Sequence, residues 1–240
     1  MSTVGIIPAR FDSTRFPGKV LFKIKDKPLI QHVYEHATKA LQHVYVATDN
    51  ELVEAVVKLF GGRVLFTSDT PKTGTDRCAE AVRDLKTVHP DIHKVINIQA
   101  DMPFIPPMYI RAINRELDTP GIEIATLVVK IGKDTETLLD KNCVKVVMSV
   151  NKFALYFSRQ TIPNIAKSTF DWDNYYKHIG VYGYAYHTLL GIHQTRQTPL
   201  ELAESLEQNR WLEHRRAVKC IEVNNDVMSI DTPEDIYKLK

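Results

Sequence analysis

Short apolar runs alternate with longer amphipathic stretches along the first half of the chain. Residues 4–7, 44–49, 64–67 and 95–99 are rich in β-branched residues and are predicted to be strands. Residues 28–41, 51–60, 76–88 and 107–117 lie between or after them and are predicted to be helices, from apolar spacing or flanking glycine and proline. Such alternation predicts an α/β fold with a doubly wound, mostly parallel sheet.

The pattern changes from residue 124 onwards. Three β-rich segments follow, at residues 124–131, 144–150 and 153–158, and Asn151-Lys152 between the last two is predicted to form a hairpin turn. A further strand, marked by glycines, is predicted at residues 178–184. We expect an antiparallel excursion over about residues 124–186, inside a single domain of residues 1–240. One helix is predicted from Pro199 through Trp211, and a second capped helix is predicted to begin at Thr232.

A basic loop follows the first predicted strand. It carries Arg10, Arg15 and Lys19, and loops at the carboxyl ends of parallel strands bind ligands. Guanidinium and ammonium groups suit a polyphosphate, although three cations are also common on a solvated surface loop. Gly18-Lys19 is followed by Val20, so the loop is not a Walker A motif.

Two further positions lie at the same predicted edge. Asp101 follows a central strand, where a carboxylate can hold Mg²⁺ against phosphate oxygens or can simply begin the turn before Pro103. Thr75 is predicted to cap the helix over 76–88, whose first N–H groups favour a polar ligand.

Composition limits the classes of protein. The chain has 240 residues, 44% hydrophobic and 25% charged, and a net charge of +2 does not favour nucleic acid as a partner. Its three cysteines are isolated, which argues against a disulfide framework or a thiolate zinc site and suits a cytoplasmic protein. No apolar stretch approaches the ~20 residues of a membrane span, and no signal peptide is recognised.

The order of residues in the basic loop resembles the signature of a known enzyme family. Residues 7–19 read I-P-A-R-x-x-S-T-R-x-P-G-K, which resembles the N-terminal signature of nucleotidyltransferases that make CMP-activated sugar acids. The 3-deoxy-manno-octulosonate (Kdo) cytidylyltransferases are the group it resembles most. Further segments resemble that family in the family's order: 46–49, 74–77, 97–101, 144–147, 154–159, 177–183, 206–208 and 231–235.

The resemblance implies a Rossmann-like nucleotidyltransferase that works as a homodimer, with the antiparallel excursion serving acceptor binding and dimerisation. It implies cytidylyl transfer from CTP to the anomeric hydroxyl of a 3-deoxy-2-ulosonic acid (Kdo), giving CMP-Kdo and pyrophosphate for lipopolysaccharide biosynthesis. The implied nucleotide contacts are Ala9, Arg10, Ser13, Lys19, Thr73, Thr75, Arg77 and Gln99. The implied sugar-acid contacts are Arg15, Arg159, His178, Tyr182, Glu207, Gln208 and Arg210. The implied catalytic residues are Arg10 and Lys19 together with the Mg²⁺ ligands Asp101 and Asp231.

Three positions depart from the usual family pattern. Ala100 stands where glycine is usual, Met102 replaces a carboxylate next to the metal site, and Val20 replaces a frequent proline. These changes leave the implied metal ligands in place, but the acceptor can be another sugar acid, such as 8-amino-Kdo or a sialic-like acid. A paralogue that binds nucleotide without catalysis is a further alternative.

Overall fold

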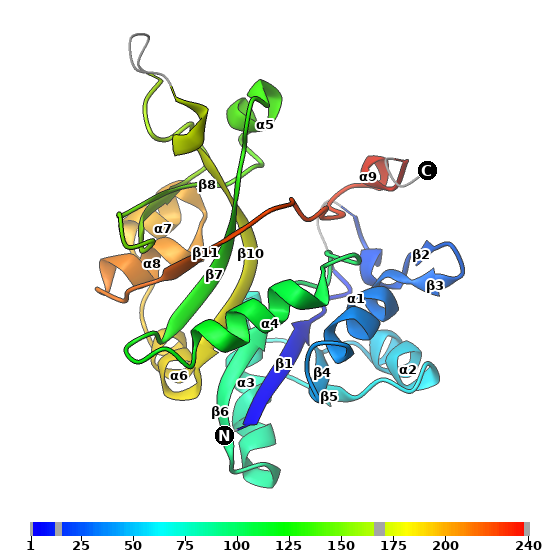
Figure 1. The fold of residues 1–240 in the computed structure, drawn as a ribbon. Coiled ribbons are helices and arrows are strands. Elements are labelled where there is room, and N and C mark those ends of the chain that lie inside the picture. The colour runs from blue at the N-terminus through cyan, green and yellow to red at the C-terminus, as the bar shows by residue number, and fades with distance from the viewer. Residues whose placement is uncertain (1, 13–15, 166–170, 238–240) are drawn as a thin grey trace.

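The computed structural model describes residues 2–12, 16–165 and 171–237, and one mixed sheet organises them (Figure 1). Its strands follow the order β11-β7-β10-β6-β1-β4-β5, and β8 and β9 extend it beside β10. The strands of this sheet are β1 (Ser2–Pro8), β4 (His43–Thr48), β5 (Val64–Phe66), β6 (Ile92–Asn97), β7 (Ile124–Lys130), β8 (Lys145–Met148), β9 (Ala154–Ser158), β10 (Tyr176–Ala185) and β11 (Lys219–Val223). A separate small hairpin joins β2 (Lys23–Ile24) and β3 (Lys27–Pro28).

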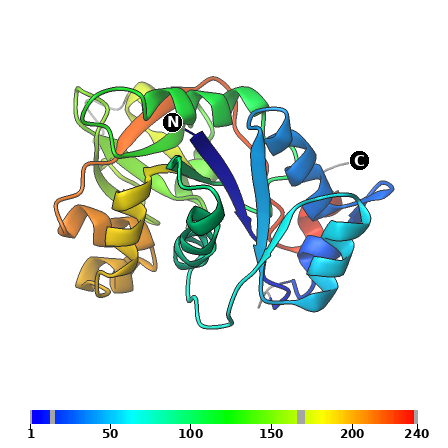
Figure 2. The same cartoon turned by 90° about the horizontal axis from the view of Figure 1, so that it is seen from below.

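Helices cover both faces of the sheet (Figure 2). One face carries α1 (Leu29–Thr38), α2 (Glu51–Leu59) and α4 (Pro107–Glu116). The other carries α3 (Gly74–Val88), α6 (Tyr186–His193), α7 (Pro199–Glu204) and α8 (Glu207–Glu213). The shorter elements are α5 (Thr135–Leu139), α9 (Pro233–Tyr237) and two 3₁₀ turns, η1 (Lys19–Leu21) and η2 (Trp172–Asn174).

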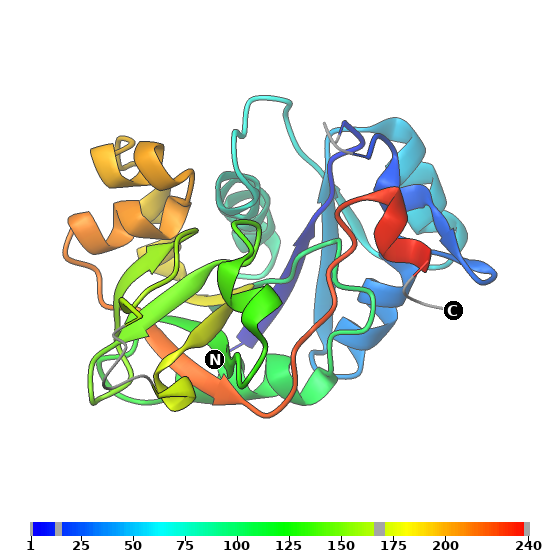
Figure 3. The same cartoon turned by 90° about the horizontal axis from the view of Figure 1, so that it is seen from above.

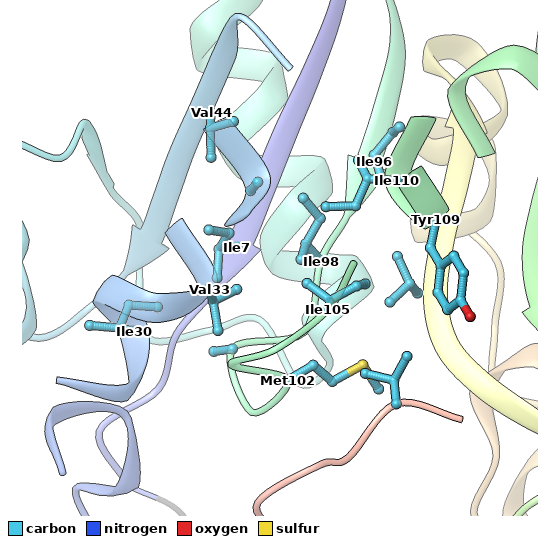
Figure 4. Close-up of a cluster of buried hydrophobic side chains, with 14 of the residues drawn as sticks. Ile7, Ile30, Val33, Val44, Ile96, Ile98, Met102, Ile105, Tyr109 and Ile110 are labelled. Carbon is cyan, nitrogen blue, oxygen red and sulfur yellow. The ribbon is translucent and has the colours of Figure 1, made fainter. Parts of the chain in front are cut away.

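Alternating side chains of the central strands supply both hydrophobic cores. Val4 and Ile6 of β1 pack under α3, whereas Ile7 packs towards α1. In β6, Val95 packs in the core on the α3 side of the sheet, and Ile96 packs in the core on the α1 side. Figure 4 shows Ile7 and Ile96 in the core on the α1 side. A period of two along a strand places successive side chains on opposite faces, so two helical layers can each bury a core.

Most elements predicted for the first half of the chain are confirmed, with their ends shifted by a few residues. β1 pairs in parallel with β4 and β6, and β4 with β5, as the alternation of strands and helices predicts. The carboxyl ends of β1 and β6 therefore lie side by side, which brings the basic loop next to the Asp101 turn.

The antiparallel pairing predicted for residues 124–186 is also present. β10 runs antiparallel to β6, β7 and β8, and β8 runs antiparallel to β9. However, β7 and β10 are strands of the main sheet, and only the β8–β9 pair lies off its path. The close backbone approach predicted for the glycines of β10 holds at Gly183, where a Cβ would lie 2.3 Å from Ile113 Cγ2 of α4.

Two predictions about helices are wrong. The helix expected from Pro199 through Trp211 is broken at Ser205, whose φ of 53° is left-handed, and α8 starts afresh at Glu207. The cap of α3 is Thr73 rather than Thr75, because Asp76 and Thr73 form a reciprocal capping box. The capped start at Thr232 is confirmed, since its backbone N–H donates to Asp235 Oδ2 at 3.0 Å.

Strand β11 and helix α6 were not predicted. β11 has only five residues, and the charged Lys219 and Glu222 interrupt its apolar positions, so little in its sequence distinguishes it from a loop. In the described part of the chain, no helix combines the length and apolar character needed to cross a membrane.

Candidate active site

A cavity of about 370 Å³ opens where the carboxyl ends of β1 and β6 meet, and we call it the Lys19 cavity. It is lined by Pro8, Arg10, Asp12, Lys19, Val20, Lys72, Gly74, Gln99, Ala100 and Asp101. Three of these residues are cations, and Arg10 also donates a hydrogen bond to the carbonyl of Pro71. Burial, followed by the nearby Arg77 guanidinium, lowers the pKa of Arg10. The cavity therefore suits an anionic ligand.

Lys19 joins the two predicted metal ligands. Its Nζ donates to Asp101 Oδ2 at 2.9 Å and to Asp231 Oδ1 at 3.4 Å, and also to the carbonyl of Ile230 at 3.1 Å. All three charged side chains are partly buried, with 13% of Lys19, 23% of Asp101 and 32% of Asp231 exposed. The structure thus brings together one cation and two carboxylates at the edge of the sheet.

The segment after β11 explains how residues so far apart in the sequence meet. It leaves β11, crosses the carboxyl edge of the sheet and leads to α9 (Figure 3), and on the way the carbonyl of Ile230 accepts a hydrogen bond from Lys19 of η1. The backbone N–H of Ile230 donates to the carbonyl of Asp101 at 2.8 Å, which fixes the two segments against each other. Burial raises the pKa of Asp101, and the Lys19 ammonium opposes that effect.

A second cavity, of about 250 Å³, adjoins the first, and we call it the His178 cavity. Gln99 and Asp101 line both cavities. The other residues of the His178 cavity are Met102, His178, Gly180, Tyr182, Leu206, Glu207, Gln208, Ser229 and Asp231. Four residues predicted to bind the sugar acid therefore lie in one cavity, next to both carboxylates. The break at Ser205 has a consequence here, because it places Glu207 and Gln208 in the first turn of α8.

His178 is held in a single protonation state. Its Nε2 lies 3.0 Å from Thr126 Oγ1, and because the Thr126 hydroxyl itself donates to the carbonyl of Val181 at 2.8 Å, the imidazole is the donor. Burial lowers the pKa of His178 to about 3. The ring is therefore neutral under ordinary conditions, and it packs edge-on against Phe157 at 5.0 Å between ring centroids.

This buried histidine predicts acid sensitivity. The unfolded chain takes up a proton on His178 below the ordinary histidine pKa of 6.5, whereas the folded chain does so only near 3. Its contribution to the free energy of unfolding therefore falls as pH drops from 6.5 to 3, by ~1.4 kcal/mol per pH unit. Between pH 7 and pH 5, the wild type is expected to lose about 2 kcal/mol more than His178→Asn. Urea unfolding at both pH values measures this.

The exposed His93 provides the matched control, since His93→Asn is expected to keep the wild-type dependence on pH. If His178→Asn loses as much stability on acidification as the wild type, the buried neutral imidazole is not the cause.

Glu207 joins the first turn of α8 to the first turn of α3. Its Oε1 accepts a hydrogen bond from Thr75 Oγ1 at 2.6 Å, and burial raises the pKa of its carboxyl group. The Thr75 hydroxyl is fully buried and lies between Glu207 and the Tyr184 hydroxyl. The Thr75 side chain therefore contacts the wall of the His178 cavity instead of opening into the Lys19 cavity.

Arg77 is also placed differently from the position implied by the resemblance. Only 1% of it is exposed, and its guanidinium bonds to Asp49 Oδ2 at 2.6 Å, with Thr67 Oγ1 as a further partner. It ties α3 to the ends of β4 and β5. Ala9 is likewise buried, and its N–H donates to the carbonyl of Ala47 at 2.8 Å.

Two arginines expected at the sugar acid lie outside the His178 cavity. The guanidinium of Arg159 donates to the carbonyls of Glu204 at 3.0 Å and Lys141 at 3.3 Å. Arg210 is buried, donates to the carbonyl of Thr195 at 3.2 Å and lines a separate cavity of about 440 Å³. Thr73 lines that separate cavity too. Ser13 and Arg15 lie outside the described residues.

The three departures from the family pattern lie against the core. Val20, Ala100 and Met102 are all buried and belong to one hydrophobic cluster, in which Figure 4 shows Met102. Met102 points into that cluster, where a carboxylate would be desolvated, and it also borders the His178 cavity.

Several residues of the site had no signal in the sequence. Lys72 lines the Lys19 cavity, and Thr126 fixes the His178 ring from the neighbouring strand β7. A further cavity of about 690 Å³ lies beside the His178 cavity and includes the ion pair of Lys177 Nζ with Asp226 Oδ2 at 2.7 Å. These contacts depend on strand pairing and on the course of the segment after β11, so single-sequence patterns do not reveal them.

The donor set at Lys19 fits Mg²⁺ in its chemistry. Within the described residues there is no cluster of three or more metal-binding side chains. Two carboxylates next to an anion-binding cavity are nevertheless enough, because Mg²⁺ uses one or two protein carboxylates together with phosphate oxygens and water. The Lys19 ammonium already lies between these carboxylates, so the position favours positive charge.

This fold and site define an α/β nucleotidyltransferase, and the sequence profile of the family described as "Cytidylyltransferase" matches residues 4–220. The chain is 45% identical to the 3-deoxy-manno-octulosonate cytidylyltransferase of Parabacteroides distasonis, over 99% of this chain and 96% of that protein. It is 46% identical to the Bacteroides thetaiotaomicron protein of the same name, over 98% and 96%. The solved structure of a CMP:2-keto-3-deoxy-manno-octonic acid synthetase complexed with CTP superposes with a TM-score of 0.91 at 36% identity, covering 100% of this chain and 97% of that one.

The chain therefore belongs to the cytidylyltransferase family and, within it, to the 3-deoxy-manno-octulosonate cytidylyltransferases. The resemblance seen in the sequence is confirmed, as are the α/β nucleotidyltransferase fold and the enzyme class.

Proposed function

We propose that the chain transfers the cytidylyl group of CTP to the anomeric hydroxyl of Kdo, forming CMP-Kdo and releasing pyrophosphate. The observation that carries this proposal is the joint position of Lys19, Asp101 and Asp231 between the Lys19 cavity and the His178 cavity. A nucleotide and an acceptor bound in the two cavities would meet at these three side chains.

The chain's own residues act mainly by positioning and by neutralising charge, the two contributions that phosphoryl transfer depends on most. Arg10, Lys19 and Lys72 line the cavity that would receive the triphosphate. Neutral His178, Tyr182 and Gln208 offer hydrogen-bonding groups to the hydroxyls of the acceptor.

Asp101 and Asp231 would hold Mg²⁺. When bound there, the ion would offset charge on the phosphates and ease deprotonation of the acceptor hydroxyl. Asp231 lies on the side of the acceptor, since it lines the His178 cavity and not the Lys19 cavity. We assign it to the hydroxyl and carboxylate of the sugar acid, and Asp101 to the phosphates.

The rival acceptors differ from Kdo in charge or in their side chain. An 8-amino-Kdo or a sialic-like acid would use the same phosphoryl chemistry, so the choice among them depends on the His178 cavity and its neighbour. The position of Lys19 between both carboxylates argues against a paralogue that binds nucleotide without catalysis. We further propose a homodimer, which sedimentation of the purified chain would test.

CTP is expected to be clearly preferred over ATP and GTP. Gln99 lines the Lys19 cavity, and a site that hydrogen-bonds a base rejects other bases because its groups are left unpaired. Pyrophosphate release, measured with Kdo and each nucleotide in turn, tests the preference and the activity together. Comparable release from all the nucleotides would exclude a base-specific site. Release of pyrophosphate with CTP and a sialic acid, but not with CTP and Kdo, would mean that the acceptor is a sialic acid and not Kdo.

A further inference from the structure

Asn97, the last residue of β6, has a buried side-chain amide for which the proposed reaction gives no role. The residue is 0% exposed, and its Oδ1 accepts a hydrogen bond from Gln99 Nε2 at 3.0 Å. Its Nδ2 is buried and has no hydrogen-bond partner among the described residues. Buried polar groups are normally paired, and an unpaired one destabilises the fold. We therefore expect the Asn97 amide to have a function that offsets this cost.

The contact with Asn97 determines how Gln99 meets a ligand. Gln99 is partly exposed and lines both the Lys19 cavity and the His178 cavity. Its Nε2 is directed at Asn97, so its Oε1, on the other arm of the planar amide, is free to accept a hydrogen bond. No residue in the described part of the chain donates to that oxygen, and it is not among the buried unpaired atoms.

An amide in this orientation distinguishes the two pyrimidines. Cytosine carries an amino group at C4, a donor that a carbonyl oxygen accepts, and its N3 is an acceptor. Uracil carries an oxygen at C4 and a proton at N3, which is the reverse pattern. A free glutamine could serve either base by turning its amide over. With the buried Asn97 amide in the orientation seen here, that turn would place Gln99 Oε1 against Asn97 Oδ1, two acceptors in contact.

We propose that Asn97 is a positioning residue that holds the Gln99 amide with its oxygen towards the base, and so makes the site prefer cytosine to uracil. The proposal rests on the proposed function, since it requires the base to reach Gln99. Asn97 itself touches no ligand, and its effect passes entirely through Gln99.

Asn97→Leu tests this, because leucine is close to asparagine in shape but cannot accept a hydrogen bond. The measurement is calorimetric binding of CTP and of UTP with no acceptor present. We expect the ratio of the two affinities to fall by about five- to tenfold, the scale of one hydrogen bond. The fall should come mainly from tighter UTP binding. A general loss of structure would weaken both nucleotides and leave the ratio unchanged, and an unchanged ratio would overturn the proposal.

Asn97→Asp is the second variant and decides the matter if Asn97→Leu does not fold. Its carboxylate still accepts from Gln99 Nε2, so the preference for CTP is expected to persist. A CTP-to-UTP affinity ratio well above that of the wild type would mean that Asn97 Nδ2 donates to Gln99 Oε1 in the wild type, because the carboxylate would then have turned the glutamine amide over, and this contradicts the orientation proposed here. Wild-type turnover of CTP and Kdo is measured separately. If it is absent, the proposed function fails, whereas an unchanged binding ratio in Asn97→Leu refutes only the role of Asn97.

Discussion

Asp101→Asn and Asp231→Asn are each expected to lower turnover by about 100- to 1,000-fold, the scale of losing one preorganised electrostatic contact. Asparagine is nearly isosteric with aspartate, so the change removes charge and leaves the shape of the site. The two carboxylates contact the same ammonium group, that of Lys19. The double variant should therefore be little worse than the worse single variant, because groups that act as a unit are strongly non-additive.

Turnover measured against Mg²⁺ concentration for the singles and the double distinguishes this from a purely structural role. A structural role for Asp231 predicts a lower melting temperature with Mg²⁺-dependent turnover intact. Asp173→Asn serves as the control, because Asp173 is exposed and pairs with Lys130 on the surface. Wild-type activity of Asp231→Asn at limiting Mg²⁺ would remove Asp231 from the metal site and leave Asp101 to hold the ion alone.

Lys19→Ala is the second change expected to have a large effect. It should cost about 2–4 kcal/mol of transition-state stabilisation, since it removes a charge contact to the triphosphate. The structure adds a second reason, because the variant leaves the carboxylates of Asp101 and Asp231 next to each other without their shared ammonium.

Steady-state kcat/KM for the variant and for Lys23→Ala measures this effect. Lys23 is an exposed lysine on the neighbouring hairpin, and its loss is expected to leave activity unchanged. Near-normal kcat/KM for a folded Lys19→Ala protein would mean that Lys19 serves only to hold the segment before α9 in place.

The parts of the fold that local patterns govern were predictable. The strand before Pro8, the strand before Asp101 and the helices between them follow from apolar periodicity, and parallel strands then bring their carboxyl ends to one edge. The break at Ser205 was not predictable, because a capped, apolar stretch predicts one helix and a serine gives no signal of the left-handed conformation found there. β11 was missed because a five-residue strand interrupted by Lys219 and Glu222 has a weak pattern.

The residues of the site were likewise predictable only in part. Residue types at motif positions identified Lys19, Asp101, Asp231, His178 and Glu207, which the structure brings to two adjoining cavities. The position of a residue in a motif did not reveal whether its side chain points into a cavity. Thr75 and Arg77 belong to a matching segment, yet their side chains turn away from the Lys19 cavity to Glu207 and Asp49. A helix presents successive residues to different sides, so a matched segment does not make every residue in it a ligand contact.

The most direct test of the proposed function is to identify the product. Purified chain, CTP, Kdo and Mg²⁺ are incubated, and ³¹P NMR follows the phosphorus signals while mass spectrometry identifies the sugar product. We expect a phosphodiester signal of CMP-Kdo and an equal amount of pyrophosphate, both formed about 100- to 1,000-fold more slowly by the Asp101→Asn, Asp231→Asn double variant. Pyrophosphate formed without CMP-Kdo, or no reaction of the folded wild type with Kdo, would contradict the proposal.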